Sequence, residues 1–182
     1  MALDIRSLRR LIAWALALPF LWDCRPTFTL LFAGIPLSML GLIVRGWAAG
    51  SIHKDHELAI SGPYAHVRNP LYLGTLLIGI GVTIAGGKSG WSILFLAYFV
   101  VVYRLTISLE QDRLSELFGS VYSKYASSVP SFIPRLVPYK PDQNTVRYGF
   151  SCKRYCQNKE WEALVGVLGV FSLLAWKSFL GL

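Results

Sequence analysis

Charged residues are scarce in this chain, at 15% of its 182 residues against 54% hydrophobic residues. A soluble domain carries about 25% charged residues, and a disordered chain has few aromatic residues. This chain is 14% aromatic. The composition therefore argues against a soluble domain and against disorder, and it favours a protein whose main solvent is lipid.

Cysteine and acidic residues are also few. The three cysteines, Cys24, Cys152 and Cys156, form neither an even set nor a Cys-x-x-Cys pair, so they support neither a disulfide scaffold nor a zinc ribbon. Ten acidic residues against 18 basic ones leave a net charge of +8. Because no basic block is interleaved with aromatic residues, we expect no nucleic-acid partner and a charge that faces anionic lipid headgroups.

The sequence contains several long runs of uncharged residues. A helix needs roughly 17 to 25 apolar residues to cross a bilayer, and the runs 26–44 and 69–87 have 19 uncharged residues each. Shorter runs at 89–103 and 163–176 have polar or charged ends that can reach the interface. With the run at 11–22, they predict about five transmembrane helices.

The first of these runs follows three arginines, which is also typical of a signal peptide. The sequence Trp-Asp-Cys-Arg-Pro at 22–26 offers no cleavage site flanked by small residues. We therefore predict a retained helix, with a cleaved or interfacial segment as the alternative.

The basic residues are divided unevenly between the two sides of such a protein. With a cytoplasmic N-terminus, 15 Lys and Arg residues fall in the inner segments, and three, Arg25, Lys88 and Lys177, fall outside or at the far end of the last span. Positive charge collects in cytoplasmic loops. This pattern predicts that segments 45–69 and 104–160 share the cytoplasmic side and build any polar active site there.

The connection between the third and fourth runs is very short, at residues 86–90. It predicts a tight antiparallel hairpin that brings residues 68–72 close to residues 104–110. Small residues four positions apart predict close helix packing in lipid. The pairs are Gly34 and Ser38, Gly46 and Gly50, and Gly81 and Ala85.

An amphipathic helix is predicted after the fourth run, because its apolar residues recur at helical spacing and the polar ones occupy the other face. It should end before Pro130. Glu110 lies four residues before Leu114 and thus on the apolar stripe, so we expect its carboxylate to face protein or a cavity. An ion pair of Glu110 with Arg104 or Arg113 in the headgroup zone is the alternative.

Residues 62–74 predict a turn followed by a helix start, with Asn69 as the cap before a proline in the first turn. The free N–H groups of such a helix end attract carboxylates. Arg68 adds a planar cation, and Tyr64 and Tyr72 add aromatic faces for a cationic or heteroaromatic ligand. A capped helix with interfacial tyrosines and no ligand is the structural alternative.

The segment His53-Lys54-Asp55-His56-Glu57 has two histidines at a spacing that can bind a metal ion. No third ligand with a known spacing follows. We therefore predict a solvated turn beside the membrane and no metal site.

Taken together, these segments resemble the isoprenylcysteine carboxyl methyltransferase family and its phospholipid methyltransferase relatives. The resemblance covers about residues 45–134 of a predicted single membrane domain, 1–182, and leaves a connector and last span at 135–182 outside it. The residues that carry it are Gly62, Pro63, Tyr64, Arg68, Asn69, Pro70, Tyr72, Gly74, Glu110, Leu114, Phe118, Gly119, Tyr122, Tyr125, Val129, Pro130, Phe132, Ile133 and Pro134.

The resemblance implies an all-α, multi-pass methyltransferase that uses S-adenosylmethionine at the cytoplasmic face and methylates a lipidated or lipid acceptor from the bilayer. Arg68 would be catalytic, with Gly62 and Pro63 shaping the floor of the pocket. The residues that would line the cofactor pocket are Tyr64, Arg68, Asn69, Tyr72 and Glu110.

The chain departs from the family pattern at two positions. Asn69 stands where the family usually has histidine, and Gln111 stands where it has a second acidic residue. An amide does not titrate near neutral pH, which excludes a base at position 69. A carboxylate acceptor, which needs no base, is therefore favoured over a phospholipid amine. An NADPH-dependent relative of the sterol reductases and a non-catalytic membrane protein are further alternatives.

Overall fold

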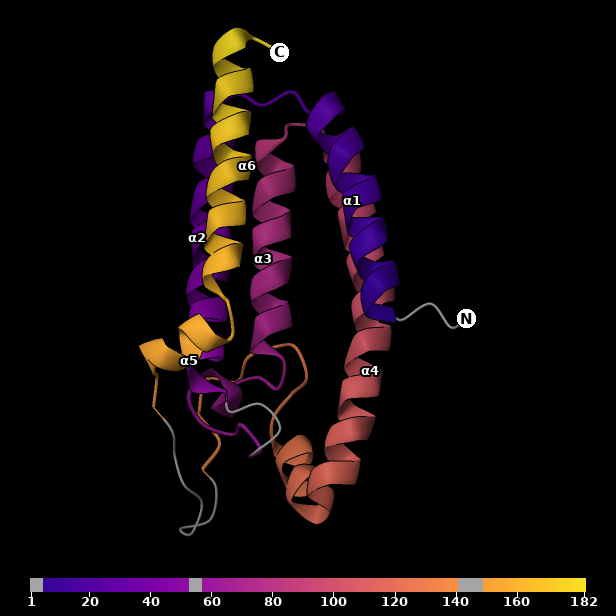
Figure 1. Ribbon diagram of the computed structural model, residues 1–182, viewed down its shortest axis with the longest axis vertical. Coiled ribbons are helices and arrows are strands. Elements are labelled where there is room, and N and C mark those ends of the chain that lie inside the picture. The colour runs from indigo at the N-terminus through magenta and orange to yellow at the C-terminus, as the bar shows by residue number, and fades with distance from the viewer. Residues whose placement is uncertain (1–4, 53–56, 141–148) are drawn as a thin grey trace.

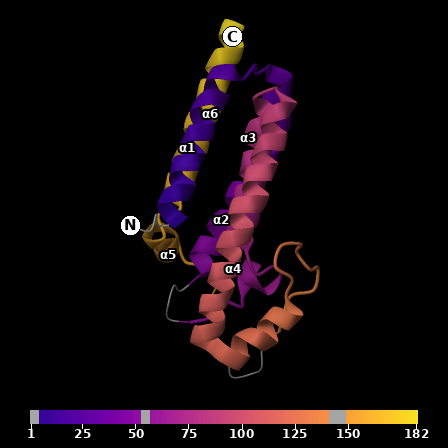
Figure 2. The same ribbon diagram turned by 90° about the vertical axis from the view of Figure 1, so that its right-hand side faces the viewer.

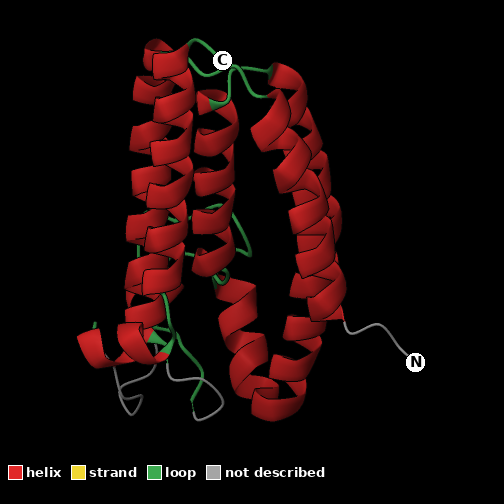
Figure 3. Cartoon of the chain, turned by 45° about the horizontal axis from the view of Figure 1, so that its top comes forward, coloured by secondary structure: helices red, strands yellow, loops and turns green. Residues whose placement is uncertain are grey.

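The computed structural model describes residues 5–52, 57–140 and 149–182, with side chains from residue 11 onward. These ranges contain six α-helices and one 3-10 helix, without a β-strand (Figure 3). The predicted all-α class is confirmed. His53 and His56 of the predicted turn lie outside the described residues.

Five long helices run along the molecule (Figure 1). They are α1 (Ile5–Asp23), α2 (Phe28–Ser51), α3 (Pro70–Ala85), α4 (Ser89–Ser128) and α6 (Trp161–Leu180). Helices α2, α3 and α6 pack together, while α1 lies along α4. The short helices η1 (Gly62–Ala65) and α5 (Cys152–Gln157) lie at one end, which we call the site end.

Three of these helices, α2, α4 and α6, are long and apolar enough to cross a membrane, and the apolar parts of α1 and α3 are shorter. Large apolar side chains point outward from them, and Phe32 is 75% exposed and Trp14 66% exposed. Such faces are stable only against lipid. The protein is therefore an integral membrane protein, and the crossing by all five helices stays a prediction.

Small residues form the contact between α2 and α3. A Cβ on Gly34 would overlap the carbonyl oxygen of Gly81 and the methyl group of Ala85, and a Cβ on Gly81 would meet Ser38. Without side chains in the way, the two backbones approach closely and gain dispersion contacts. The predicted packing of these two small-residue pairs is confirmed.

The third predicted pair does not pack against another span. Gly46 faces the ring of Tyr155 in α5, and Gly50 faces the ring of Phe150. Both rings come from the connector before the last helix. The expectation of helix packing in lipid was wrong for this pair, because α2 extends to Ser51 and its last turns leave the apolar run.

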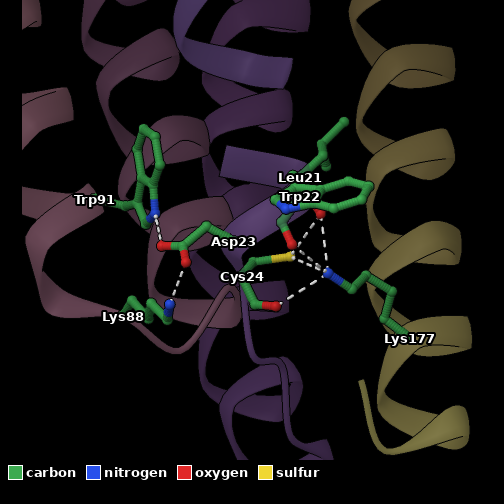
Figure 4. Close-up of polar contacts among 7 residues, drawn as sticks. All are labelled: Leu21, Trp22, Asp23, Cys24, Lys88, Trp91 and Lys177. Atoms are coloured by element: carbon green, nitrogen blue, oxygen red, sulfur yellow. Dashed lines mark hydrogen bonds and ion pairs between the residues drawn. The ribbon is translucent and has the colours of Figure 1, made fainter. Parts of the chain in front are cut away.

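The predicted hairpin is confirmed, since α3 ends at Ala85 and α4 begins at Ser89. At this end, opposite the site end, Asp23 pairs with Lys88 and accepts a hydrogen bond from Trp91 Nε1 at 2.9 Å (Figure 4). The ammonium group of Lys177 donates to carbonyl oxygens at the end of α1 and just after it: Leu21 at 3.0 Å, Trp22 at 3.2 Å and Cys24 at 3.1 Å.

Helix α4 differs from the sequence prediction, which separated a fourth span from an amphipathic helix. One continuous helix runs from Ser89 through residue 118, and a sharp kink at Gly119, where φ is 50° and ψ is −123°, separates it from a second helical stretch that reaches Ser128 (Figure 2). Glycine adopts this backbone without the clash that a Cβ would cause. The helix ends at Ser128, before Pro130 as predicted.

Beyond the bend, part of the predicted apolar stripe is buried. Tyr122 and Tyr125 pack with Ile60 and Val129 in a small core. Leu117 and Val121, on the same predicted stripe, are 55% and 58% exposed. The bend turns only one side of the stripe toward the protein, so the predicted amphipathic face is confirmed in part.

Candidate functional site

A cavity of about 480 Å³ lies at the site end, where α3 begins and α4 approaches its bend. This volume lies within the range of small-molecule sites, roughly 300 to 1,000 Å³. The cavity is lined by η1, the first turn of α3, and α4 on both sides of Gly119. All five predicted pocket residues line it: Tyr64, Arg68, Asn69, Tyr72 and Glu110.

The hairpin brings the two predicted segments into direct contact. Tyr72 OH donates a hydrogen bond to Glu110 Oε2 at 2.9 Å, across 38 residues of sequence. The ring of Tyr72 also lies edge-on to Tyr103, with ring centroids 5.0 Å apart. The carboxylate of Glu110 therefore belongs to the cavity wall, as its place on the apolar stripe predicts.

Arg68 is half-buried and is held from two sides. Its backbone N–H donates to the carbonyl of Pro130 at 2.9 Å, and its Nη1 donates to Tyr122 OH at 3.4 Å. Its Nε is buried and has no hydrogen-bond partner in the described part of the chain. A guanidinium at a cavity wall that has an N–H donor without a hydrogen-bond partner can bind a carboxylate through its planar fork.

Tyr64 is buried in the cavity wall by the tight turn of η1. Gly62, with φ of 60°, starts this turn, and His66 N–H closes it on the carbonyl of Pro63 at 3.1 Å. The carbonyl of Tyr64 accepts a hydrogen bond from Tyr125 OH at 2.7 Å, while the Tyr64 hydroxyl has no hydrogen-bond partner within residues 5–52, 57–140 and 149–182.

Burial raises the pKa of the Tyr64 phenol above its ordinary value of 10.0, and the nearby charge of Glu110 adds to the shift. Loss of the proton would leave an anion in a medium that solvates it poorly. The hydroxyl of Tyr64 therefore keeps its proton and is available as a donor.

Asn69 is the cap residue of α3, as predicted, and its side chain has a further role. It occupies the cap position before Pro70, but its side chain makes no capping hydrogen bond. Its Nδ2 donates instead to the carbonyl oxygen of Ser131 at 2.9 Å and to the Ser131 hydroxyl at 3.0 Å. Gln111 Nε2 donates to the same hydroxyl at 3.3 Å.

The two positions that depart from the family pattern therefore meet at one serine. Both amides hold the segment after α4 against the cavity, and both side chains line it. The predicted place of Asn69 as the cap residue before α3 is confirmed, whereas its contact with Ser131, 62 residues away in sequence, cannot be read from local spacing.

Apolar and aromatic side chains complete the cavity wall. Leu114, Phe118, Tyr122 and Tyr125 come from the amphipathic part of α4. Their helical periodicity predicts a buried stripe but does not say what the stripe faces. Glu57 also lines the cavity, whereas no group of three metal-ligating side chains occurs among the residues that the structure describes.

Known proteins are similar to this chain in the region that contains the cavity residues. A family model described as phospholipid methyltransferase matches residues 28–121. Protein-S-isoprenylcysteine O-methyltransferase of Schizosaccharomyces pombe is 34% identical over 90 residues, which are 50% of this chain and 38% of that protein. Protein-S-isoprenylcysteine O-methyltransferase B of Arabidopsis thaliana is 29% identical over 121 residues, 62% of this chain and 60% of that protein.

A bacterial relative has a different kind of name. Cobalt-zinc-cadmium resistance protein CzcN of Cupriavidus metallidurans is 31% identical over 144 residues, 77% of this chain and 64% of that protein. The chain thus spans less than two thirds of the length of these relatives. No solved structure gives a significant match.

The matched region runs from the start of α2 to just beyond the bend of α4 and covers more than half of the chain. It contains every predicted pocket residue, from Tyr64 to Glu110, and both helices of the hairpin. The chain belongs to the phospholipid methyltransferase family.

Proposed function

We propose that this protein is an S-adenosylmethionine-dependent membrane methyltransferase that acts on a lipid-embedded acceptor, in the manner of isoprenylcysteine carboxyl O-methyltransferases. The observation that carries the proposal is the composition of the cavity wall. One cavity combines the carboxylate of Glu110 with several tyrosine rings and with the guanidinium of Arg68, whose Nε has no hydrogen-bond partner among the described residues. Family membership supports the reaction class.

The groups in the wall fit this methyl donor. Arg68 would hold its carboxylate through a bidentate pair, and Glu110 would accept hydrogen bonds from its ammonium group or ribose hydroxyls. Tyr64 and Tyr72 offer aromatic faces to a cationic or heteroaromatic group. Two buried donors, Arg68 Nε and Tyr64 OH, lack partners among the residues that the structure describes, and such groups are normally satisfied.

When bound, the donor supplies a methyl group activated by its attachment to a sulfonium. The protein contributes position and the removal of water, which are the main requirements of a methyl displacement. Arg68 orients the donor, and the apolar side chains of Leu114 and Phe118 line the cavity and limit the entry of water. None of these residues has to exchange a proton.

The acceptor that fits best is a carboxylate on a lipidated group. A carboxylate needs no general base, and Asn69 at the family's histidine position cannot act as one, since it is a neutral amide bound to Ser131. Two of the relatives carry names of isoprenylcysteine O-methyltransferases. The distribution of basic residues supports a cytoplasmic N-terminus and a cytoplasmic site end.

Methylation of a phospholipid amine is the second candidate. The description of the family model favours it. Because a protonated amine must lose a proton, this reaction would need a base, and Glu110 is a carboxylate in the cavity wall that could serve.

Donor binding is the direct test of the proposal. Titration calorimetry of the purified protein with S-adenosylmethionine should show saturable binding, and NADPH should show none. Radiolabelled donor then distinguishes the acceptors, with a prenylated cysteine methyl-acceptor peptide in one assay and phosphatidylethanolamine vesicles in the other. Absence of donor binding would reject the enzyme in favour of a non-catalytic membrane protein.

A further inference from the structure

The last helix, α6, lies outside the region matched by the family model, yet a buried ion pair ties Glu160, the residue just before this helix, to α2 at the site end. Arg45 Nε donates to Glu160 Oε1 at 2.5 Å, and Arg45 Nη2 donates to Glu160 Oε2 at 3.0 Å. Glu160 is 7% exposed and Arg45 is 23% exposed. The pair is bidentate and largely removed from water, so each charge depends on the other.

The same guanidinium reaches α3. Arg45 Nη1 donates to Thr75 Oγ1 at 2.5 Å and approaches the carbonyl oxygen of Leu71 at 3.5 Å. Leu71 and its neighbour Tyr72 line the 480 Å³ cavity. Arg45 therefore joins the carboxylate of Glu160, at the start of α6, to the turn of α3 that forms the cavity wall.

A second cavity of about 300 Å³ borders the same turn. Its walls include Arg45, Thr75 and Tyr103, together with Leu71 and Tyr72. Leu71 and Tyr72 thus line both cavities. A displacement of the first turn of α3 would change the shape of both.

The connector before α6 adds contacts to the same region. Asn158 Nδ2 donates to the carbonyl of Ala49 at 2.8 Å, and Arg154 Nε donates to that of Gly50 at 2.8 Å. These carbonyls belong to the last turn of α2, where no intrahelical partner remains. The connector therefore holds the end of α2 that carries Arg45 and leaves the guanidinium little freedom.

We propose that Glu160 is a positioning residue of the donor site. Through Arg45 it holds the first turn of α3, and with it the Tyr72 hydroxyl that donates to Glu110. The helix outside the family match is thereby part of the scaffold of the site. The effect on donor binding rests on the proposed function, whereas the effect on α3 does not.

The test compares Glu160→Gln with Asp23→Asn, which removes the carboxylate of the ion pair at the opposite end of the molecule. The readouts are amide hydrogen exchange of residues 71–75, the thermal midpoint, and the Kd for S-adenosylmethionine. Glu160→Gln should raise exchange at 71–75 and weaken donor binding, each by about tenfold or more, because small displacements at a site have large effects. Asp23→Asn should leave both unchanged.

Equal exchange at 71–75 in Glu160→Gln and the unmodified protein would overturn the proposal, as would an equal rise in both variants. If Glu160→Gln does not fold, Glu160→Asp decides, because it keeps the charge, shortens the side chain that reaches Arg45, and leaves the hydrogen bond from Thr75 Oγ1 to the Leu71 carbonyl in place. It should raise exchange in the same residues, and unchanged exchange would overturn the proposal. If the unmodified protein binds no donor, the proposed function fails, and hydrogen exchange alone decides the role of Glu160.

Discussion

Arg68 shows how one side chain can be held in place and still have a donor free. Its backbone and Nη1 are bonded within the protein, while its Nε is buried without a partner. Arg68→Lys keeps the positive charge and loses the planar fork, so donor affinity or turnover should fall by roughly tenfold or more, about 1.4 kcal/mol. Calorimetry measures the donor affinity, and thermal unfolding checks that the variant stays folded. Unchanged affinity and turnover would reduce Arg68 to a structural link between Tyr122 and Pro130.

Glu110 distinguishes an enzyme from a scaffold. Glu110→Gln keeps the shape of the side chain but removes a charged acceptor, which should cost about 1.5 to 3 kcal/mol of donor affinity. In a purely interfacial role, the same change would alter stability by about 1 kcal/mol or less and leave binding alone.

The matched control for Glu110 is Glu116→Gln, the same chemical change on an exposed position of α4 that does not line the cavity. Calorimetry with S-adenosylmethionine on both variants gives the comparison. Equal losses of affinity would argue that Glu110 lies outside the donor site, whereas a loss confined to Glu110→Gln would support its role there.

At the scale of elements, the contact between α2 and α3 sets the position of the α3 start. A Cβ at Gly34 would meet backbone and methyl atoms of α3, which cannot move aside as a flexible side chain can. Gly34→Leu should therefore lower the free energy of unfolding by about 1 to 3 kcal/mol.

Gly166→Leu on α6 is the control for Gly34→Leu, because a Cβ at Gly166 meets nothing within 4 Å. Unfolding in mild detergent, followed by circular dichroism, compares the two variants. A similar midpoint for both would contradict tight packing of α2 on α3.

Helix α4 shows a second effect at this scale. The sequence pattern changes character after residue 103, and it suggests two separate elements. The backbone passes through this change without interruption and bends later, at Gly119. The change in amino-acid composition after residue 103 indicates that the surroundings of the helix change from lipid to water and protein. A helix can continue across such a change.

At the scale of the whole molecule, the arrangement of basic residues predicts opposite sides for Lys88 and for the connector. Cys152 and Cys156 are exposed natural reporters, whereas Cys24 is fully buried. In sealed vesicles of known orientation, an impermeant maleimide should label Lys88→Cys in a Cys152→Ser, Cys156→Ser background from outside. It should label Cys152 and Cys156 of the unmodified protein only after permeabilisation. Labelling of both positions from one side would contradict the predicted topology.

The amino-acid sequence by itself determined the helical class, the hairpin between residues 85 and 89, and the convergence of Tyr72 with Glu110. These follow from local properties, namely apolar run length, turn length and helical periodicity, each of which acts over a few residues. The motif residues of the candidate site could be predicted for the same reason, since a short turn fixes which helix ends become neighbours.

The tertiary structure alone decided the partners of Asn69 and Arg45. Asn69 binds Ser131 rather than its own helix, and Arg45 binds Glu160, 115 residues away. Such contacts form between segments that are far apart in sequence and meet only in the folded chain. The spacing of side chains along the sequence carries no information about which distant segments meet. A buried polar group must find a partner, but only the completed packing determines which partner lies within reach.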